Sequence, residues 1–306
     1  MHYALHVITT NAWILTASLL AIIVAFDFTW AVIRRNHNTS LKEATLWSLL
    51  YVSLAVAFGI YLGTWTDAQT QQEFFAGWLT EYSLSFDNLF VFVIILSRLK
   101  IEEKSKQLAL LFGILIALVF RIIAITLGAA AIKQFEWIFF IFGAFLIYTA
   151  VHLFIESTHE KDEEEKESKL ISYLSAKGMK PFTIALIALG ATDILFALDS
   201  IPAIFGLTEN VYVVVTANVF ALMGLRQLYF LIGGLMQRLI YIGKGLSVIL
   251  GFIGVKLLFH AFHAVDIHKL GGFKIPDITI TQSLSVIVGV LAIATVSSLV
   301  VTAKRK

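Results

Sequence analysis

Long apolar stretches separated by short polar segments dominate the chain. A bilayer core about 30 Å thick is crossed by about 20 helical residues, and stretches of that length recur along the sequence. We predict nine membrane-spanning helices, at residues 11–34, 44–66, 74–97, 106–131, 135–157, 181–206, 210–233, 236–260 and 280–302. The pattern therefore predicts an all-α membrane protein, with a single membrane domain over residues 1–306.

The composition supports this class and narrows the chemistry. Hydrophobic residues make up 58% of the chain and charged residues 14%, with a mean hydropathy of +0.85, far from a soluble globular mix. The chain has no Cys, which excludes disulfides, thiolate metal sites and cysteine nucleophiles. We expect the lipid bilayer and a metal ion as partners, and no nucleic acid. The first span is long and lacks a basic n-region and an A-x-A cleavage site, so we interpret it as retained rather than as a signal peptide.

The positive charges are distributed unequally between the two sets of loops. Of the 23 Lys and Arg residues, all but six lie on one side; the other side holds Lys133, Lys269 and Lys274, and three lie within spans. The positive-inside rule then places the N-terminus outside the cell membrane and the C-terminus in the cytoplasm. It also makes the acidic loop at 157–180 cytoplasmic, where its mixed charges are typical of a solvated, flexible segment.

Two blocks of the sequence resemble each other. Spans three to five (repeat A, about 74–157) and six to eight (repeat B, about 181–263) share similar residues in the same order. The matching positions are Glu81 and Asp193, Asp87 and Asp199, Arg121 and Arg226, Gly128 and Gly233, Gly143 and Gly254, and His152 and His263. Because each block has three spans, the second is inserted upside down relative to the first, which is typical of secondary transporters. Chance similarity of apolar helices is the alternative.

Acidic residues inside the predicted spans indicate a functional path, because charges at membrane depth are costly. There are five, with three oxygen-bearing neighbours: Asp27, Glu81, Asp87, Asp193 and Asp199, and Asn88, Ser200 and Asn218. A purely structural alternative pairs the acids with the cations within spans, Arg121, Arg226 and Lys256. That alternative does not explain why four of the acids lie in two spans at an identical spacing of six residues.

The spacing itself predicts an opened helix. Residues six apart lie about 120° apart around a regular helix and about 9 Å along it, so they do not share one ion unless the helix opens. Pro202 supplies such a helix break in span six, because its ring removes a hydrogen bond and displaces the carbonyl of Leu198 beside Asp199. We predict this carbonyl as a cation ligand, since irregular backbone at membrane depth is tolerated where it lines a cavity.

The available ligand atoms favour a hard ion. Carboxylate, amide and carbonyl oxygens suit Mg²⁺, Ca²⁺ and Mn²⁺. At the external end of span eight, His260 and His263, with Asp266 and His268, form a second candidate for an exit site. Histidines at an interface that bind no metal are the alternative there.

Two segments resemble a known family. Residues 81–92, EYSLSFDNLFVF, and 190–203, GATDILFALDSIPA, resemble the paired signatures of the TerC family of integral membrane proteins. Members similar to this chain are regarded as manganese exporters that protect cells from metal overload, and the resemblance implies a cation site at Asp87, Asn88, Asp193 and Asp199. The chain departs from many relatives at Gly190, where they carry Glu, and at Phe86, where they carry Val.

These observations predict a secondary transporter that exports Mn²⁺ from the cytoplasm, in exchange for protons. Ca²⁺ and Mg²⁺ are the alternative cargo ions, and no organic cofactor is expected. The chain has no Gly-x-x-x-x-Gly-Lys-Ser/Thr motif for ATP, and no Gly-x-Gly-Asp arrangement of an intramembrane aspartyl protease, so we do not expect an enzyme. A membrane anchor for a metal- or tellurite-stress complex, without transport, is the alternative function.

Overall fold

Helices make up nearly all of the chain that the structure describes. The structure is a computed structural model, and it describes residues 9–33, 40–101, 103–135, 137–156, 171–235, 239–270 and 273–304. The elements are α1 (Thr10–Ile33), α2 (Leu41–Trp65), α3 (Ala68–Arg98), α4 (Glu103–Gln134), α5 (Ile138–Glu156), α7 (Pro181–Phe205), α8 (Val211–Leu222), α9 (Leu225–Leu235), α10 (Ile242–Ala264), β1 (Lys269–Leu270), β2 (Phe273–Lys274) and α11 (Ile280–Lys304). β1 and β2 pair in antiparallel fashion and form a small hairpin.

Six helices of the described segments are long and apolar enough to cross a membrane. They are α1, α2, α4, α5, α10 and α11. Large hydrophobic side chains are exposed on these helices, as expected of surfaces that face lipid. The other three predicted spans correspond to α3, to α7 and to α8 followed by α9. α3 and α7 carry the acids, and almost every residue of α8 is buried, so these elements lie inside the helical assembly.

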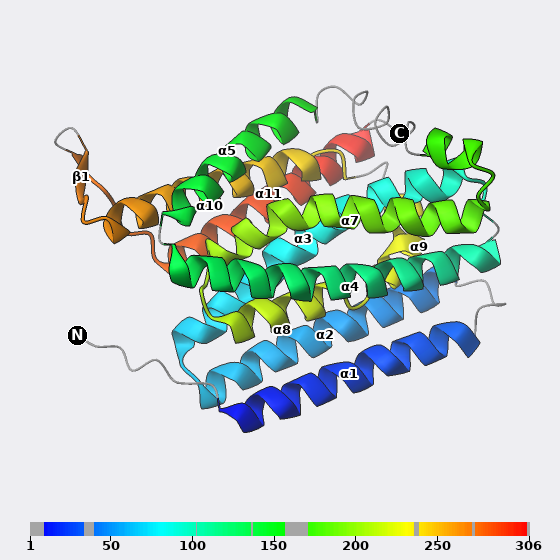
Figure 1. Cartoon of the computed structure of the whole chain (residues 1–306), viewed down its shortest axis with the longest axis horizontal. Coiled ribbons are helices and arrows are strands. Elements are labelled where there is room, and N and C mark those ends of the chain that lie inside the picture. Colours follow the sequence, from blue (N-terminus) through cyan, green and yellow to red (C-terminus); the bar gives the residue numbers. More distant parts are fainter. Residues whose placement is uncertain are drawn as a thin grey trace.

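The helices lie roughly along one common axis and alternate in direction along the chain, except that α9 continues in the direction of α8 (Figure 1). α1 begins at one end of the assembly and α11 ends at the opposite end, while the β1 and β2 hairpin projects from the end where α1 begins. In the interior, α3 packs against α8 and α4 packs against α7, while α5 packs against α10. α1 and α2 lie along one side, where α2 contacts α9 and α3.

The crossing of α5 and α10 is made by two glycines. A Cβ atom built on Gly143 would lie 2.9 Å from the carbonyl oxygen of Gly254, and one built on Gly254 would lie 3.0 Å from the carbonyl oxygen of Gly143. The nearest atoms belong to the residue four positions beyond the partner glycine: Leu258 Cδ2 lies 2.8 Å from the Cβ built on Gly143, and Ile147 Cγ1 lies 2.9 Å from the one built on Gly254. Small residues at this crossing let the two backbones approach closely, as in other membrane helix pairs.

Candidate functional site

A cluster of charged and polar side chains lies buried where α3, α4, α7 and α8 meet. Glu81, Arg121, Asp193 and Asn218 are each at most 3% exposed. The Arg121 Nη1 donates hydrogen bonds to the Glu81 carboxylate and to Asn218 Oδ1, the latter at 3.0 Å. Its Nη2 lies 3.6 Å from Asp193 Oδ1. One guanidinium therefore bridges acids from two helices that are far apart in the sequence.

Burial makes this cluster energetically demanding. A carboxylate or guanidinium taken out of water costs several kcal/mol unless a charged partner and hydrogen bonds compensate for it, and removing one partner of a buried pair costs about 3–5 kcal/mol. Glu81, Arg121 and Asp193 are compensated only as a set, because no single helix supplies both signs at this depth. The three described side chains carry two negative charges and one positive charge when all are ionised.

Several polar atoms around the cluster have no hydrogen-bond partner among the described residues. They are Oε1 of Glu81, Oδ2 of Asp193, Nε and Nη2 of Arg121, Nδ2 of Asn218, and the hydroxyl oxygens of Ser85 and Ser200. Buried polar atoms are normally satisfied, so a group of exceptions at one place indicates a water or ligand position. The predicted contributors Glu81, Ser200 and Asn218 all belong to this group.

A small cavity adjoins the cluster. Its volume is about 10 Å³, enough for about one water-sized particle. The polar side chains that line it are Ser85, Arg121 and Asp193, and apolar residues of α3, α4, α8 and α9 complete the wall. The cavity therefore brings one carboxylate, one hydroxyl and one guanidinium to a space of about the size of a water molecule.

The helical conformation is interrupted beside this cavity, between α8 and α9. Met223 is extended, with ψ of 130°, and Gly224 has φ of +84°, in the left-handed region that favours glycine. Leu222 and Leu225, on either side of the break, both line the cavity. The end of α8 and the beginning of α9 thus lie near the cluster, and helix ends at such depth are the usual ion-binding elements of transporters.

The predicted break at Pro202 is wrong in its position. α7 continues through Pro202 to Phe205, and the next residue, Gly206, donates its N–H to the Pro202 carbonyl. Pro202 lies in the last turn of the helix, where only one hydrogen bond is lost, and the buried residues 203–205 that follow it pack into the core. The predicted span that contains an interrupted helix is the next one along the chain, formed by α8 and α9, and the interruption is at Gly224.

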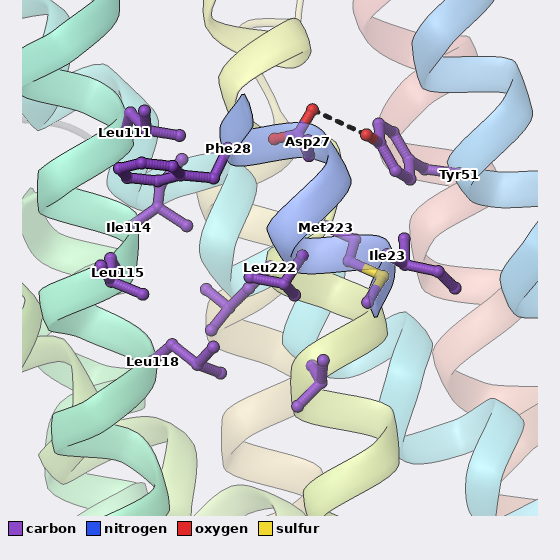
Figure 2. Close-up of a pocket in the computed structure, with 12 residues that line it drawn as sticks. Ile23, Asp27, Phe28, Tyr51, Leu111, Ile114, Leu115, Leu118, Leu222 and Met223 are labelled. Carbon is purple, nitrogen blue, oxygen red and sulfur yellow. Dashed lines mark hydrogen bonds between the residues drawn. The ribbon is translucent and has the colours of Figure 1, made fainter. Parts of the chain in front are cut away.

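A second, larger cavity lies between α1, α2, α4 and α8 (Figure 2). Its volume is about 50 Å³. Figure 2 shows Asp27 and Tyr51 at one end, where the Tyr51 hydroxyl donates a 2.7 Å hydrogen bond to Asp27 Oδ1. Apolar side chains of α4 form one wall. Ile114 and Leu222 line both this cavity and the small one, so they separate Asp27 from the buried cluster.

Comparison with known proteins identifies the family. The sequence profile of the integral membrane protein TerC family matches residues 66–306. The chain belongs to the TerC family. An uncharacterized membrane protein of Mycobacterium tuberculosis is 42% identical over 94% of this chain and 78% of its own length. A TerC relative of Escherichia coli, Alx, is named as a proposed membrane-bound redox modulator and is 34% identical over 82% of this chain and 86% of its own. No solved structure matches the chain.

Some predicted residues of this TerC protein lie elsewhere. The charges of Glu73 and Asp277 act on the ammonium of Lys256, rather than those of the central acids with which we grouped it. His260 Nε2 lies 3.3 Å from Glu209 Oε1, and the ring of His263 lies 5.1 Å from that of His268. Among the described residues, no group of three or more His, Asp or Glu side chains is arranged to hold a metal ion.

Other predicted residues lie outside the described side chains. They are Asp87, Asn88, Leu198, Asp199 and Arg226, and the acidic run of the loop at 157–170 also lies outside the described residues. The backbone places Asp87 in α3 and Asp199 in α7, each six residues beyond a member of the cluster. Gly224, where α8 ends, and Ser85, which lines the small cavity, were not predicted from the sequence, although a glycine within an apolar stretch is a recognised signal for a helix end.

Proposed function

We propose that this TerC-family chain is a secondary transporter that exports a hard divalent cation, preferentially Mn²⁺, from the cytoplasm in exchange for protons. The observation that carries the proposal is the buried cluster in which Glu81 and Asp193 share Arg121. Acids are retained at membrane depth mainly where ions or protons pass. Two carboxylates with one guanidinium leave a negative charge that a passing cation neutralises.

The packing supports an inverted repeat of α3 to α5 and α7 to α10. In such a repeat, equivalent elements exchange partners, and here α3 packs on α8 while α4 packs on α7. The third helices of the two blocks, α5 and α10, meet at the equivalent residues Gly143 and Gly254 with reciprocal contacts. Glu81 and Asp193, which are also equivalent, contact the same guanidinium. The cluster then lies at the repeat interface, the usual position of a substrate site.

The proposal includes nine crossings with an external N-terminus and a cytoplasmic C-terminus in the cell membrane. The alternating directions of the helices support this, with α8 and α9 together making one crossing (Figure 1). A tag before Met1 should be accessible from outside intact cells, and a tag after Lys306 should become accessible only after the membrane is opened. Accessibility of both tags from the same side would contradict the nine crossings and the inverted repeat.

For the cation itself we propose oxygen ligands from both halves. The unpartnered Oδ2 of Asp193 and the hydroxyl of Ser85 adjoin the small cavity. The proposed shell is completed by residues chosen from the sequence: Asp87, Asn88, Asp199 and the Leu198 carbonyl. A site of this composition prefers Mn²⁺, Mg²⁺ or Ca²⁺ over soft metals. The same carboxylates can carry protons in the opposite direction.

Transport by purified protein in liposomes tests the proposal. We expect concentrative movement of Mn²⁺ when a pH gradient is applied, with Mg²⁺, Ca²⁺ and Zn²⁺ measured as competitors. Asp193→Asn should abolish movement, because it removes the charge and keeps the volume, while the exposed acid Asp277 provides the matched control Asp277→Asn. Absence of flux for every ion would favour the membrane-anchor function, and native flux in Asp193→Asn would place the ion path elsewhere.

A further inference from the structure

Arg121 has an unusual position for a residue that only stabilises a helix bundle. It is the largest fully buried side chain of the described chain and is 1% exposed. It is also the one cation that contacts both Glu81 and Asp193 among the described residues. The guanidinium therefore lies where a transported cation would need to be to neutralise the same two acids.

The two terminal nitrogens of the Arg121 guanidinium, Nη1 and Nη2, differ in how closely they contact their partners. The Nη1 arm is fully engaged, because it donates to both Glu81 and Asn218. The Nη2 arm lies 3.6 Å from Asp193, beyond normal hydrogen-bond distance, and Nη2 has no hydrogen-bond partner among the described side chains. Asp193 is thus held by a longer contact with the guanidinium than Glu81 is, and it can exchange this contact for a stronger one.

The small cavity lies beside the contact between Arg121 and Asp193. It is lined by Arg121 and Asp193 but not by Glu81. A divalent ion entering this space would meet the unpartnered Oδ2 of Asp193 and would repel the guanidinium. Arg121 can then remain paired with Glu81 while Asp193 binds the ion.

We propose that Arg121 is a tethered counter-cation, which neutralises Asp193 when the carrier is empty and yields Asp193 to the cargo ion when the carrier is loaded. This inference rests on the proposed transport function and adds a role for one residue. In the proposed exchange, the carrier that returns without Mn²⁺ brings protons back on some of its acids, and an acid that stays ionised must be neutralised in another way, since an unpaired buried carboxylate is costly. Arg121 supplies that neutralisation without leaving the protein. A residue with this role is needed for the empty return step and not for the loaded step.

Two transport modes separate these steps. Net transport moves Mn²⁺ into liposomes that contain none, so it requires the empty return. Exchange of radiolabelled Mn²⁺ across a membrane with equal Mn²⁺ on both sides uses the loaded form alone. We expect Arg121→Gln to lower net transport by about tenfold or more, the scale of one coupling interaction. We expect its exchange rate to stay within about threefold of the parent, which is less than the smallest effect of such a coupling, about fivefold. Its affinity for Mn²⁺ should rise, because a repelling charge is removed.

Charge-matched variants distinguish the loss of the proposed role of Arg121 from misfolding caused by unpaired buried charge. Arg121→Gln leaves two acids unpaired, so the double variant Glu81→Gln with Arg121→Gln restores the charge balance of the cluster, and Arg121→Lys keeps the cation. The double variant should show the same loss of net transport, and Arg121→Lys should retain part of it. Elution as a single species verifies the fold of each sample.

The results distinguish a counter-cation role of Arg121 from a purely structural role. Net transport at the parent rate in Arg121→Gln or in the double variant would overturn the inference. Loss of both modes in folded Arg121→Gln protein would also overturn it, because a structural residue is needed in every step. If the parent protein exchanges no Mn²⁺, the proposed function fails, and the inference fails with it.

Discussion

Substitution of Gly143 by Ala tests the close crossing of α5 and α10. The new Cβ would lie 2.8 Å from Leu258 Cδ2 and 2.9 Å from the Gly254 carbonyl oxygen. The leucine can rotate, but the carbonyl is backbone, so the helices must separate. Overpacking of this kind costs about 1–3 kcal/mol, whereas Ala in place of Gly gains about 1 kcal/mol in helix propensity. The net effect on Gly143→Ala alone is therefore between about zero and 2 kcal/mol of lost stability.

A matched control isolates the steric part. Gly289 in α11 has no atom within 4 Å of a built Cβ, so Gly289→Ala gains propensity without a clash. The two variants should therefore differ by the full steric cost of about 1–3 kcal/mol. At about 2–4 °C per kcal/mol, this is a difference of about 2–12 °C in the midpoint of thermal unfolding. The assay is loss of the monodisperse species on heating, for all proteins in one detergent.

The reciprocal variant extends the test. Gly254→Ala should be destabilised to a similar extent, because its Cβ would lie 2.9 Å from Ile147 Cγ1 and 3.0 Å from the Gly143 carbonyl. The double variant should lose less than the sum, since helices already separated for one methyl group partly accommodate the other. Equal midpoints for Gly143→Ala and Gly289→Ala would refute the close crossing.

Three further predictions concern the cavities and the helix break. Gly224→Ala should lower stability by about 1–3 kcal/mol relative to the parent, because the left-handed conformation costs about 1–2 kcal/mol and the Cβ would approach the Tyr51 ring; an unchanged thermal midpoint would contradict it. Tyr51→Phe keeps that ring contact and removes the hydroxyl that donates to Asp27, so thermal unfolding should show a loss of about 1–2 kcal/mol. Because the chain has no Cys, Ala117→Cys introduces a single thiol into the small cavity. Leu222→Ala should open the wall between the two cavities, so an aqueous thiol reagent should label this cysteine faster in the double variant. Equal labelling rates with and without that opening would show that the wall does not control access.

The positions of the helices could be predicted from the sequence because hydropathy reports them directly. The predicted span at 106–131 lies within α4, and the span at 280–302 lies within α11. The break at Gly224 was missed for a physical reason. The stretch at 210–233 is apolar enough overall to be predicted as one span, although it contains Asn218, Arg226 and Gln227. Hydropathy does not record whether the backbone within such a stretch is helical throughout.

The candidate site was only partly predictable. Glu81, Arg121 and Asp193 stand out in the sequence because each is a charge within an apolar span. Their meeting at one point depends on the rotation of each helix about its axis and on which helices are neighbours, and neither follows from the composition of a single span. Lys256 shows the limit of such a prediction. It is also a charge within an apolar span, but the acids whose charges act on it are Glu73 and Asp277.

The two halves differ in shape at an equivalent place, and this difference bears on the proposed mechanism. Gly224 lies two residues before Arg226, and Val119 lies two residues before the equivalent Arg121, yet α4 is continuous there. Val is β-branched and is strongly disfavoured in a left-handed conformation, so α4 cannot adopt the break of α8 and α9. The halves therefore cannot alternate by exchanging this feature. Under the proposed transport function, we therefore expect access to alternate by rigid-body movement of one half against the other, and the close crossing of α5 and α10 is one contact between the two halves.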